Sequence, residues 1–229
     1  NYYIKGIFVL SDKEVKIYRQ PPAAGGKSSQ LIVFLHGYGA DGKDLIDLAN
    51  PFSMAMPNAS FISPDAPKPC SMSPSGREWF PIEQVPTGAI KASKNLIELL
   101  ELEAKKLNLT FKETILIGFS QGAMMSLQCL LINKYKFGGI IGYSGALKIE
   151  NLDACNDQII NGKHIHSDTP VLLVHGEKDE VVPYQSLINS KSLLSQIGFD
   201  VQTLSRPELG HGIDPEGISA GMELLKKIK

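Results

Sequence analysis

The fold is decided by one stretch of the sequence, Thr114-Ile-Leu-Ile-Gly118-Phe-Ser120-Gln-Gly122-Ala123. A short apolar run ends in the pattern Gly-x-Ser-x-Gly, and a segment of helical periodicity through Leu130 follows at once. A serine hydroxyl is a weak nucleophile, so it must project from a sharp strand-to-helix turn to reach both a base and a substrate. Glycines two residues before and after it leave room for the strand and the helix to close up. The stretch therefore predicts a nucleophile at Ser120.

A rival serine stands in Ile140-Ile-Gly142-Tyr-Ser144-Gly-Ala146, where Ser144 also ends a strand-like run. There the second position after the serine is Ala146, and no long amphipathic helix follows. The helix after Ser120 points its amino end at the site, where free N–H groups favour a developing oxyanion. This context favours Ser120 over Ser144.

Composition excludes several classes of protein. The chain has 229 residues, 43% of them hydrophobic and 21% charged, which is ordinary for a globular protein and fits one α/β domain spanning residues 1–229. A formal net charge of −1 argues against binding to nucleic acid. No apolar run reaches the length of a bilayer span, and the start lacks the plan of a signal peptide. The three cysteines, Cys70, Cys129 and Cys155, have no metal-ligand spacing, so we expect reduced thiols in a cytoplasmic protein without a metal site.

Strands and helices alternate from Leu31 to the end of the chain. Residues 14–18 alternate as a half-exposed edge strand does, and residues 43–56 predict an irregular helix broken by Pro51. Further strands are expected at residues 31–35, 60–63, 114–118, 137–142, 171–174 and 200–204, and helices at 90–107, 121–130, 184–197 and 215–228. This alternation predicts one mostly parallel, doubly wound sheet with helices on both faces.

Four segments carry signals of their own. Glycines in the His36–Gly42 segment let the backbone approach a ligand, and the N–H of Tyr38 is a candidate oxyanion donor, whereas His36 is interpreted as a buried structural residue. The Pro- and Ser-rich loop at residues 64–88 is too long for a plain connector. It contains Trp79 and Phe80, which are expected either to fill the core or to form the wall of a substrate pocket.

The polar insertion at residues 148–169 holds His164 and His166, for which a solvated loop is favoured over a metal pair. Gly25-Gly-Lys-Ser28 lacks the upstream glycine of a phosphate-binding loop, so a hairpin loop is favoured there.

Ligands of such sheets bind at the carboxyl ends of the strands, and three candidate catalytic residues follow separate strands there. Ser120, Asp179 and His211 have the chain order that an α/β-hydrolase triad requires. His36, His164, His166 and His175 precede Asp179, so chain order removes them as the base. Among the acids, Asp214 is better explained as a helix cap, and Glu177 and Glu180 as exposed loop charges.

Six motifs stand in order along the chain: residues 35–42 (LHGYGADG), 61–67 (FISPDAP), 76–80 (GREWF), 118–123 (GFSQGA), 175–183 (HGEKDEVVP) and 210–213 (GHGI). Together they resemble the phospholipase/carboxylesterase family of α/β-hydrolases, which includes bacterial carboxylesterases and acyl-protein thioesterases. The resemblance implies that Ser120 is the nucleophile, His211 the general base and acid, and Asp179 the orienting carboxylate. It also implies an oxyanion hole formed by the backbone N–H groups of Tyr38 and Gln121. The family commonly has Leu at the position of Tyr38, a departure that bears on the shape of the acyl pocket.

The implied reaction is hydrolysis of a carboxylic ester with a short or medium acyl chain, or of a lysophospholipid, through an acyl-serine and without any cofactor. Trp79 and Phe80 are the expected substrate-binding residues. The expected partner is a small ester or acyl-thioester substrate, with neither nucleic acid nor stable membrane insertion, and a homodimer is left open. An acyl-protein thioesterase is the alternative activity, and a catalytically silent hydrolase-fold binding protein is the alternative of another class.

Overall fold

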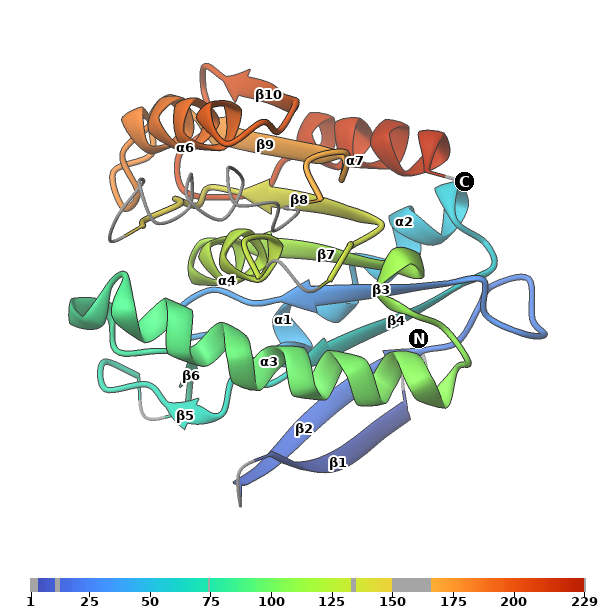
Figure 1. The fold of residues 1–229 in the computed structure, drawn as a ribbon. Helices are drawn as coiled ribbons and strands as arrows, with labels where there is room; N and C mark the ends of the chain where they lie inside the picture. The colour runs from blue at the N-terminus through green and yellow to red at the C-terminus, as the bar shows by residue number, and fades with distance from the viewer. Residues whose placement is uncertain (1–3, 11–12, 74, 133–134, 150–165, 229) are drawn as a thin grey trace.

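The computed structural model describes residues 4–10, 13–73, 75–132, 135–149 and 166–228. In this part of the chain an eight-stranded sheet has the strand order β1-β2-β4-β3-β7-β8-β9-β10 (Figure 1). The strands are β1 (Ile4–Leu10), β2 (Lys13–Gln20), β3 (Gln30–Leu35), β4 (Ala59–Pro64), β7 (Thr114–Phe119), β8 (Gly139–Tyr143), β9 (Val171–Gly176) and β10 (Val201–Arg206). All pairs from β4 to β10 are parallel, and β1 and β2 add antiparallel strands at one edge. The prediction of a mostly parallel sheet is confirmed.

Helices cover both faces of the sheet, as Figure 1 shows. α3 (Thr87–Lys106), α4 (Gln121–Leu130) and α6 (Gln185–Gln196) pack on one face, and α1 (Gly42–Ile46), α2 (Ala49–Ala55) and α7 (Pro215–Lys227) on the other. Successive side chains of a strand point to opposite faces, so a strand covered on both faces has to be apolar throughout. In β3, Val33 and Leu35 face the α3 side, and Phe34 faces the α7 side.

The start of the chain differs from the prediction. β2 is not an edge strand, because β1 pairs with its outer side and β4 with its inner side. The alternation that indicated an edge instead reflects Val15 and Ile17, which are buried against the α3 side. The prediction that Pro51 breaks the next helix is also wrong. The break falls at residues 47–48, and Pro51 lies in the first turn of α2, where a missing N–H costs no helical hydrogen bond.

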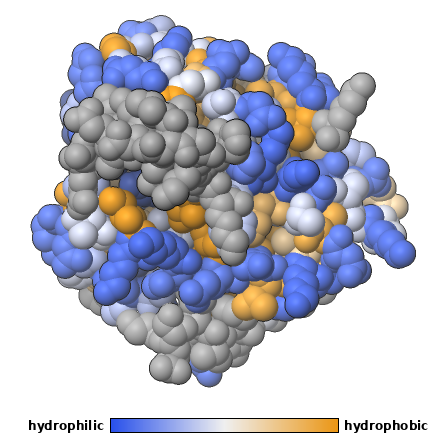
Figure 2. Space-filling model, viewed as in Figure 1, coloured by the Kyte–Doolittle hydropathy of each residue, from blue (hydrophilic) through white to orange (hydrophobic). Residues whose placement is uncertain are grey.

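α3 is amphipathic, and its inner face packs against the sheet. Its outer side is mostly hydrophilic, which is visible on the face shown in Figure 2. Glu103, however, is buried rather than exposed, and its carboxylate accepts two hydrogen bonds of 2.8 Å from Arg19 of β2. A buried charge needs such a partner. This ion pair joins α3 to the antiparallel edge of the sheet.

The loop at residues 64–88 contains short regular elements. β5 (Lys68–Pro69) and β6 (Arg77–Glu78) form a two-stranded hairpin, and a 3-10 turn follows at Ile82–Gln84. No described helix is both long and apolar enough to cross a bilayer. The loops after β3, β7, β9 and β10 all emerge at the carboxyl edge of the parallel strands, where the candidate site lies.

Candidate active site

Ser120 occupies the turn between β7 and α4, with backbone angles φ 53° and ψ −117°. A positive φ on a residue with a side chain is strained by about 1–3 kcal/mol, and such strain is found where the surrounding structure enforces it. A Cβ on Gly118 would lie 2.3 Å from the carbonyl oxygen of Gly122, and one on Gly122 would lie 1.8 Å from that of Leu35. The two glycines therefore permit the close approach of β7, α4 and β3 that the pattern predicts.

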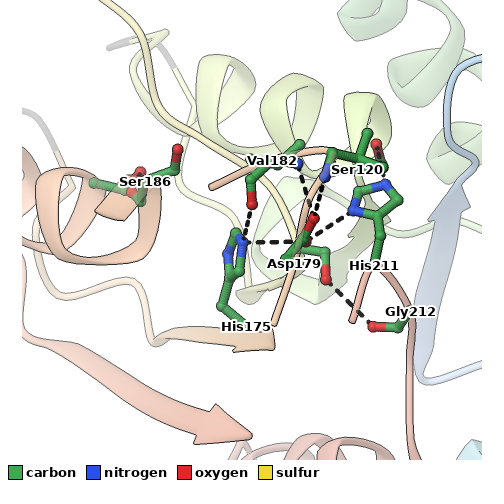
Figure 3. A network of polar contacts seen from close by, with 10 residues as sticks. Ser120, His175, Asp179, Val182, Ser186, His211 and Gly212 are labelled. Atoms are coloured by element: carbon green, nitrogen blue, oxygen red, sulfur yellow. Dashed lines mark hydrogen bonds and ion pairs between the residues drawn. The ribbon is translucent and has the colours of Figure 1, made fainter. Parts of the chain in front are cut away.

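A chain of two hydrogen bonds connects three loops (Figure 3). Nε2 of His211 lies 3.0 Å from Oγ of Ser120, and Nδ1 of His211 lies 2.8 Å from Oδ2 of Asp179. A carboxylate only accepts hydrogen bonds, so Nδ1 carries the proton and Nε2 of a neutral imidazole is left to accept one from the serine. The structure thus brings together the three residues that chain order singled out. It holds them in the geometry of a nucleophile, a base and an orienting acid.

The Asp179 side chain is fully buried. Burial works to raise its pKa, but hydrogen bonds from His211 and from the N–H groups of Val182 and Val181 more than offset this, so the pKa of Asp179 lies below its ordinary value. Asp179 therefore stays ionised beside His211 at neutral pH.

His175, which chain order excludes as the base, has a place of its own behind Asp179. Its Nε2–H donates to the carbonyl of Val182 at 2.8 Å, and the same nitrogen lies 3.2 Å from Oδ2 of Asp179 (Figure 3). The contact closes the turn that presents the Asp179 carboxylate. Sequence reasoning missed this role, although the short spacing between His175 and Asp179 was a usable signal.

The candidate oxyanion donors lie on either side of Ser120. Tyr38 follows β3, and Gln121 is the first residue of α4. Within the described part of the chain, neither backbone N–H has a carbonyl partner in hydrogen-bond geometry. Both are therefore free to donate to a substrate oxygen, and the amino end of α4 adds its dipole to the same place.

His36 is a buried structural residue, as interpreted from the sequence. Its Nε2 accepts a hydrogen bond from the N–H of Ala66, so Nδ1 carries the proton and donates to the carbonyl of Gly37. Burial lowers the pKa of His36 from 6.5 to about 4. A neutral His36 thus fixes the peptide group that carries the Tyr38 N–H.

Trp79 and Phe80 are nearly fully buried, at 4% and 1% exposure. The indole N–H of Trp79 donates to the carbonyl of His36 at 2.9 Å. The side-chain amide of Gln121 accepts from the N–H of Trp79 and donates to the carbonyl of Phe80. A single set of hydrogen bonds therefore joins the two candidate oxyanion donors through residues 79 and 80.

The same two aromatics also line a cavity of about 160 Å³ on the α3 side, which none of Ser120, Asp179 and His211 touches. From the sequence, Trp79 and Phe80 are expected to be either part of the core or the wall of a pocket. The structure shows that they belong to the hydrophobic core and also line a cavity. Their contact with a substrate stays a prediction.

The alternative serine and the alternative acidic residues lie outside the hydrogen-bond chain of Ser120, His211 and Asp179. Ser144 also has a positive φ, of 49°, but its Oγ donates to the carbonyl of Gly212 at 3.3 Å instead of reaching His211. Asp214 caps α7 and pairs with Arg206, as predicted for a cap, and Glu177 and Glu180 are exposed.

No His, Cys, Asp and Glu cluster suited to a metal occurs among the described residues. His164 and Cys155 lie outside the described residues. Cys70 and Cys129 are buried free thiols, and the Gly25–Gly26 segment is an open turn with positive φ at both glycines.

Fold and site together define the class, an α/β-hydrolase with a serine at the turn after its central strand. The chain belongs to the phospholipase/carboxylesterase family, whose model matches residues 22–229, and it is a carboxylesterase-family hydrolase. It is similar to acyl-protein thioesterase 1 of Gibberella zeae, with 29% identity over 220 residues covering 89% of this chain and 92% of that protein. Esterase YpfH of Escherichia coli is 25% identical over 204 residues, covering 87% and 83%. The crystal structure of esterase PE8 superimposes with a TM-score of 0.80 at 32% identity, covering 92% of this chain and 97% of that one.

Proposed function

We propose that this protein hydrolyses carboxylic esters with short or medium acyl chains through a covalent acyl-serine. Ser120 is the nucleophile, His211 the general base and acid, and Asp179 the carboxylate that orients His211. The observation that carries the proposal is the continuous hydrogen-bond chain from Oγ of Ser120 through His211 to the buried Asp179. No metal or organic cofactor enters the proposed reaction.

In the first half-reaction, Nε2 of His211 takes the Ser120 proton while Oγ attacks the ester carbonyl carbon. The carbonyl π pair moves onto its oxygen, and the N–H groups of Tyr38 and Gln121 stabilise the resulting oxyanion. When the pair returns, the bond to the alcohol oxygen breaks, and His211 gives its proton to that leaving oxygen. The products of this half are a free alcohol and the acyl-serine.

In the second half-reaction, water replaces the alcohol. His211 removes a water proton as the hydroxyl attacks the acyl carbon, and the same oxyanion donors stabilise the new tetrahedral intermediate. Its collapse breaks the bond to Oγ of Ser120, which takes the proton back from His211. The fatty acid leaves, and the enzyme returns to its starting state.

A fluorophosphonate probe tests the proposal against a silent hydrolase-fold binding protein. We expect the probe to label the wild-type chain, and peptide mapping to place the label on Ser120. Turnover of p-nitrophenyl esters of two to twelve acyl carbons gives the chain-length preference in parallel. Absence of both labelling and turnover would leave the binding-protein alternative.

Thioester hydrolysis is a second candidate, favoured by the relatives named acyl-protein thioesterase 1 in Gibberella zeae and Candida albicans. A thiolate is a better leaving group than an alkoxide, so the same site would cleave thioesters with less demand on His211 as acid. Comparing kcat/KM for an ester and a thioester of equal acyl length decides between the two preferences. Lysophospholipid cleavage, a homodimer and a cytoplasmic location stay predictions.

A further inference from the structure

The cavity beside Trp79 has no role in the proposed reaction. It lies between α3, the loop after β4 and strand β2, and its volume is about 160 Å³. Apolar side chains form much of its wall, namely Val15, Trp79, Phe80, Ala92, Leu96 and Leu99. An apolar protein cavity of roughly 150 Å³ holds a molecule the size of benzene. A space of this size therefore suits an apolar chain of about six carbons.

Two lysines belong to the lining of this cavity. Lys68 is half-buried in β5, and Lys91 is exposed on α3. Neither has an ion-pair partner among the described residues. Lysine stems pack along apolar surface while the ammonium groups stay in water, so the positive charge belongs at the mouth of the cavity.

One carboxylate, that of Asp65, also lines the cavity, and its negative charge opposes the binding of an anion. Its Oδ1 accepts a hydrogen bond from the N–H of Gly42, and Arg77 and Lys16, which do not line the cavity, act on the same carboxylate as neighbouring cations. Burial is the largest influence on the pKa of Asp65 and, together with the nearby Asp41, raises it in spite of these cations. The two lysines outnumber this one carboxylate in the lining, so the net charge around the cavity is positive. Lys68 and Lys91 are left to attract an anion.

We propose that this cavity binds the carboxylate of a short- or medium-chain fatty acid, with the chain against Trp79 and the carboxylate between Lys68 and Lys91. The inference rests on the proposed function in one respect, because ester hydrolysis releases this class of compound. The site is separate from Ser120. It meets the catalytic loops through Trp79, whose indole N–H donates to the carbonyl of His36, and through Phe80, whose carbonyl accepts from the Gln121 side chain.

Trp79 is the single tryptophan of the chain, so its fluorescence reports directly on the cavity. Titration with hexanoate and octanoate should give a saturable change in emission. Each added methylene should tighten binding about fourfold until the cavity is filled. 1-Octanol should bind at least several-fold more weakly than octanoate. Equal affinities of the alcohol and the acid would overturn the role of the lysines.

Charge reversal supplies the matched variants. Lys68→Glu with Lys91→Glu should weaken octanoate binding more than tenfold, whereas Lys94→Glu, an exposed residue of the same helix outside the cavity, should change it less than twofold. Ala92→Leu should abolish binding by filling the space, and a melting curve shows whether each variant is folded. If Ala92→Leu does not fold, the lysine variants still decide. Equal effects of the lysine pair and of Lys94→Glu would refute the site.

Two further arms separate this site from the catalytic one. Octanoate should still bind after fluorophosphonate has blocked Ser120, and it should bind to Ser120→Ala. Binding lost on labelling would place the ligand at the catalytic serine and overturn the inference. An inactive chain that binds octanoate would contradict only the proposed function, and an active esterase without octanoate binding would contradict only the cavity.

Discussion

At the scale of single residues, Ser120 and Ser144 make a natural pair for comparison, because both end a strand with a positive φ. Ser120→Ala removes the proposed nucleophile and should lower kcat by about 10⁴–10⁶-fold while the melting temperature stays near that of the wild type. Ser144→Ala deletes only the contact to Gly212 and should keep activity within tenfold. Ester turnover by purified Ser120→Ala within tenfold of the wild type would remove Ser120 from the mechanism.

The pH dependence of activity follows from the proposed role of His211 as the general base. Only a neutral imidazole can accept the Ser120 proton, so kcat/KM should be low at acid pH and rise with pH to a plateau. Asp179 has a lowered pKa and stays ionised in the range measured, so it adds no second step to the profile. Initial rates with a soluble ester between pH 5 and 8.5 measure the profile. A flat profile with chemistry rate-limiting would exclude His211 as the base.

A substitution at Trp79 can lower activity either by destabilising the fold or by changing the site, so two variants are needed to separate the effects. Trp79→Ala should cost about 3–5 kcal/mol of unfolding free energy, because the side chain is buried. Trp79→Phe keeps most of the ring and deletes the hydrogen bond to His36, so it should lower kcat about tenfold for every acyl length. Turnover of an ester series by Trp79→Phe is the measurement. A changed chain-length preference would instead identify a direct contact between Trp79 and the acyl chain.

At the scale of elements, the amino end of α4 is fastened to the 64–88 loop by the Gln121 side chain. Gln121→Met removes both hydrogen bonds and leaves two buried main-chain groups unpaired. If these contacts position the oxyanion donors, kcat should fall about ten- to a hundredfold with little change in KM, because the donors act mainly on the transition state. The affinity of a boronic acid transition-state analogue should fall in parallel.

The control for Gln121→Met lies on the same helix. Gln128 is also buried, but its amide donates to the carbonyl of Lys148, away from the oxyanion loop. Gln128→Met should therefore keep kcat and the affinity for the analogue near their wild-type values. Equal losses in the two variants would mean that Gln121 acts on the stability of α4 alone.

The elements also show where prediction from the sequence succeeds. β3, β7 and β9 are buried on both faces, so their apolar runs identify them without any tertiary information. The cap at Asp214 and the glycines around Ser120 are equally local signals.

The role of β1, by contrast, depends on its pairing with β2, and the break at residues 47–48 has no glycine or proline to mark it. Chain order found Ser120, Asp179 and His211, but the contacts among Gln121, Trp79 and His36 join residues more than 40 positions apart.

At the scale of the whole molecule, His36 couples stability to pH. Its Nε2 must stay unprotonated to accept from the N–H of Ala66, and its folded pKa of about 4 lies below the unfolded value of 6.5. The stabilisation is therefore complete above about pH 6.5 and is lost as the pH falls towards 4. The difference corresponds to about 3 kcal/mol.

Denaturant titrations at pH 7, 5.5 and 4 test this coupling. The unfolding free energy of the wild type should fall with pH over this range, and that of His36→Gln should fall about 3 kcal/mol less, whatever its absolute value. Parallel slopes for the two proteins would show that His36 does not carry the effect.

The β5–β6 hairpin has a consequence for how such a protein can diversify. The N–H of Gly39 donates to the carbonyl of Arg77, and the N–H of Arg77 donates to that of Ala40, so two main-chain hydrogen bonds fasten the hairpin to the loop that carries Tyr38. One side-chain contact, between the hydroxyls of Tyr38 and Ser71, adds to them. Side chains at the hairpin turn, such as the 83% exposed Met72, can be exchanged without moving that donor. After a gene duplication, copies can therefore change the surface of this turn while the position of the Tyr38 N–H is inherited unchanged.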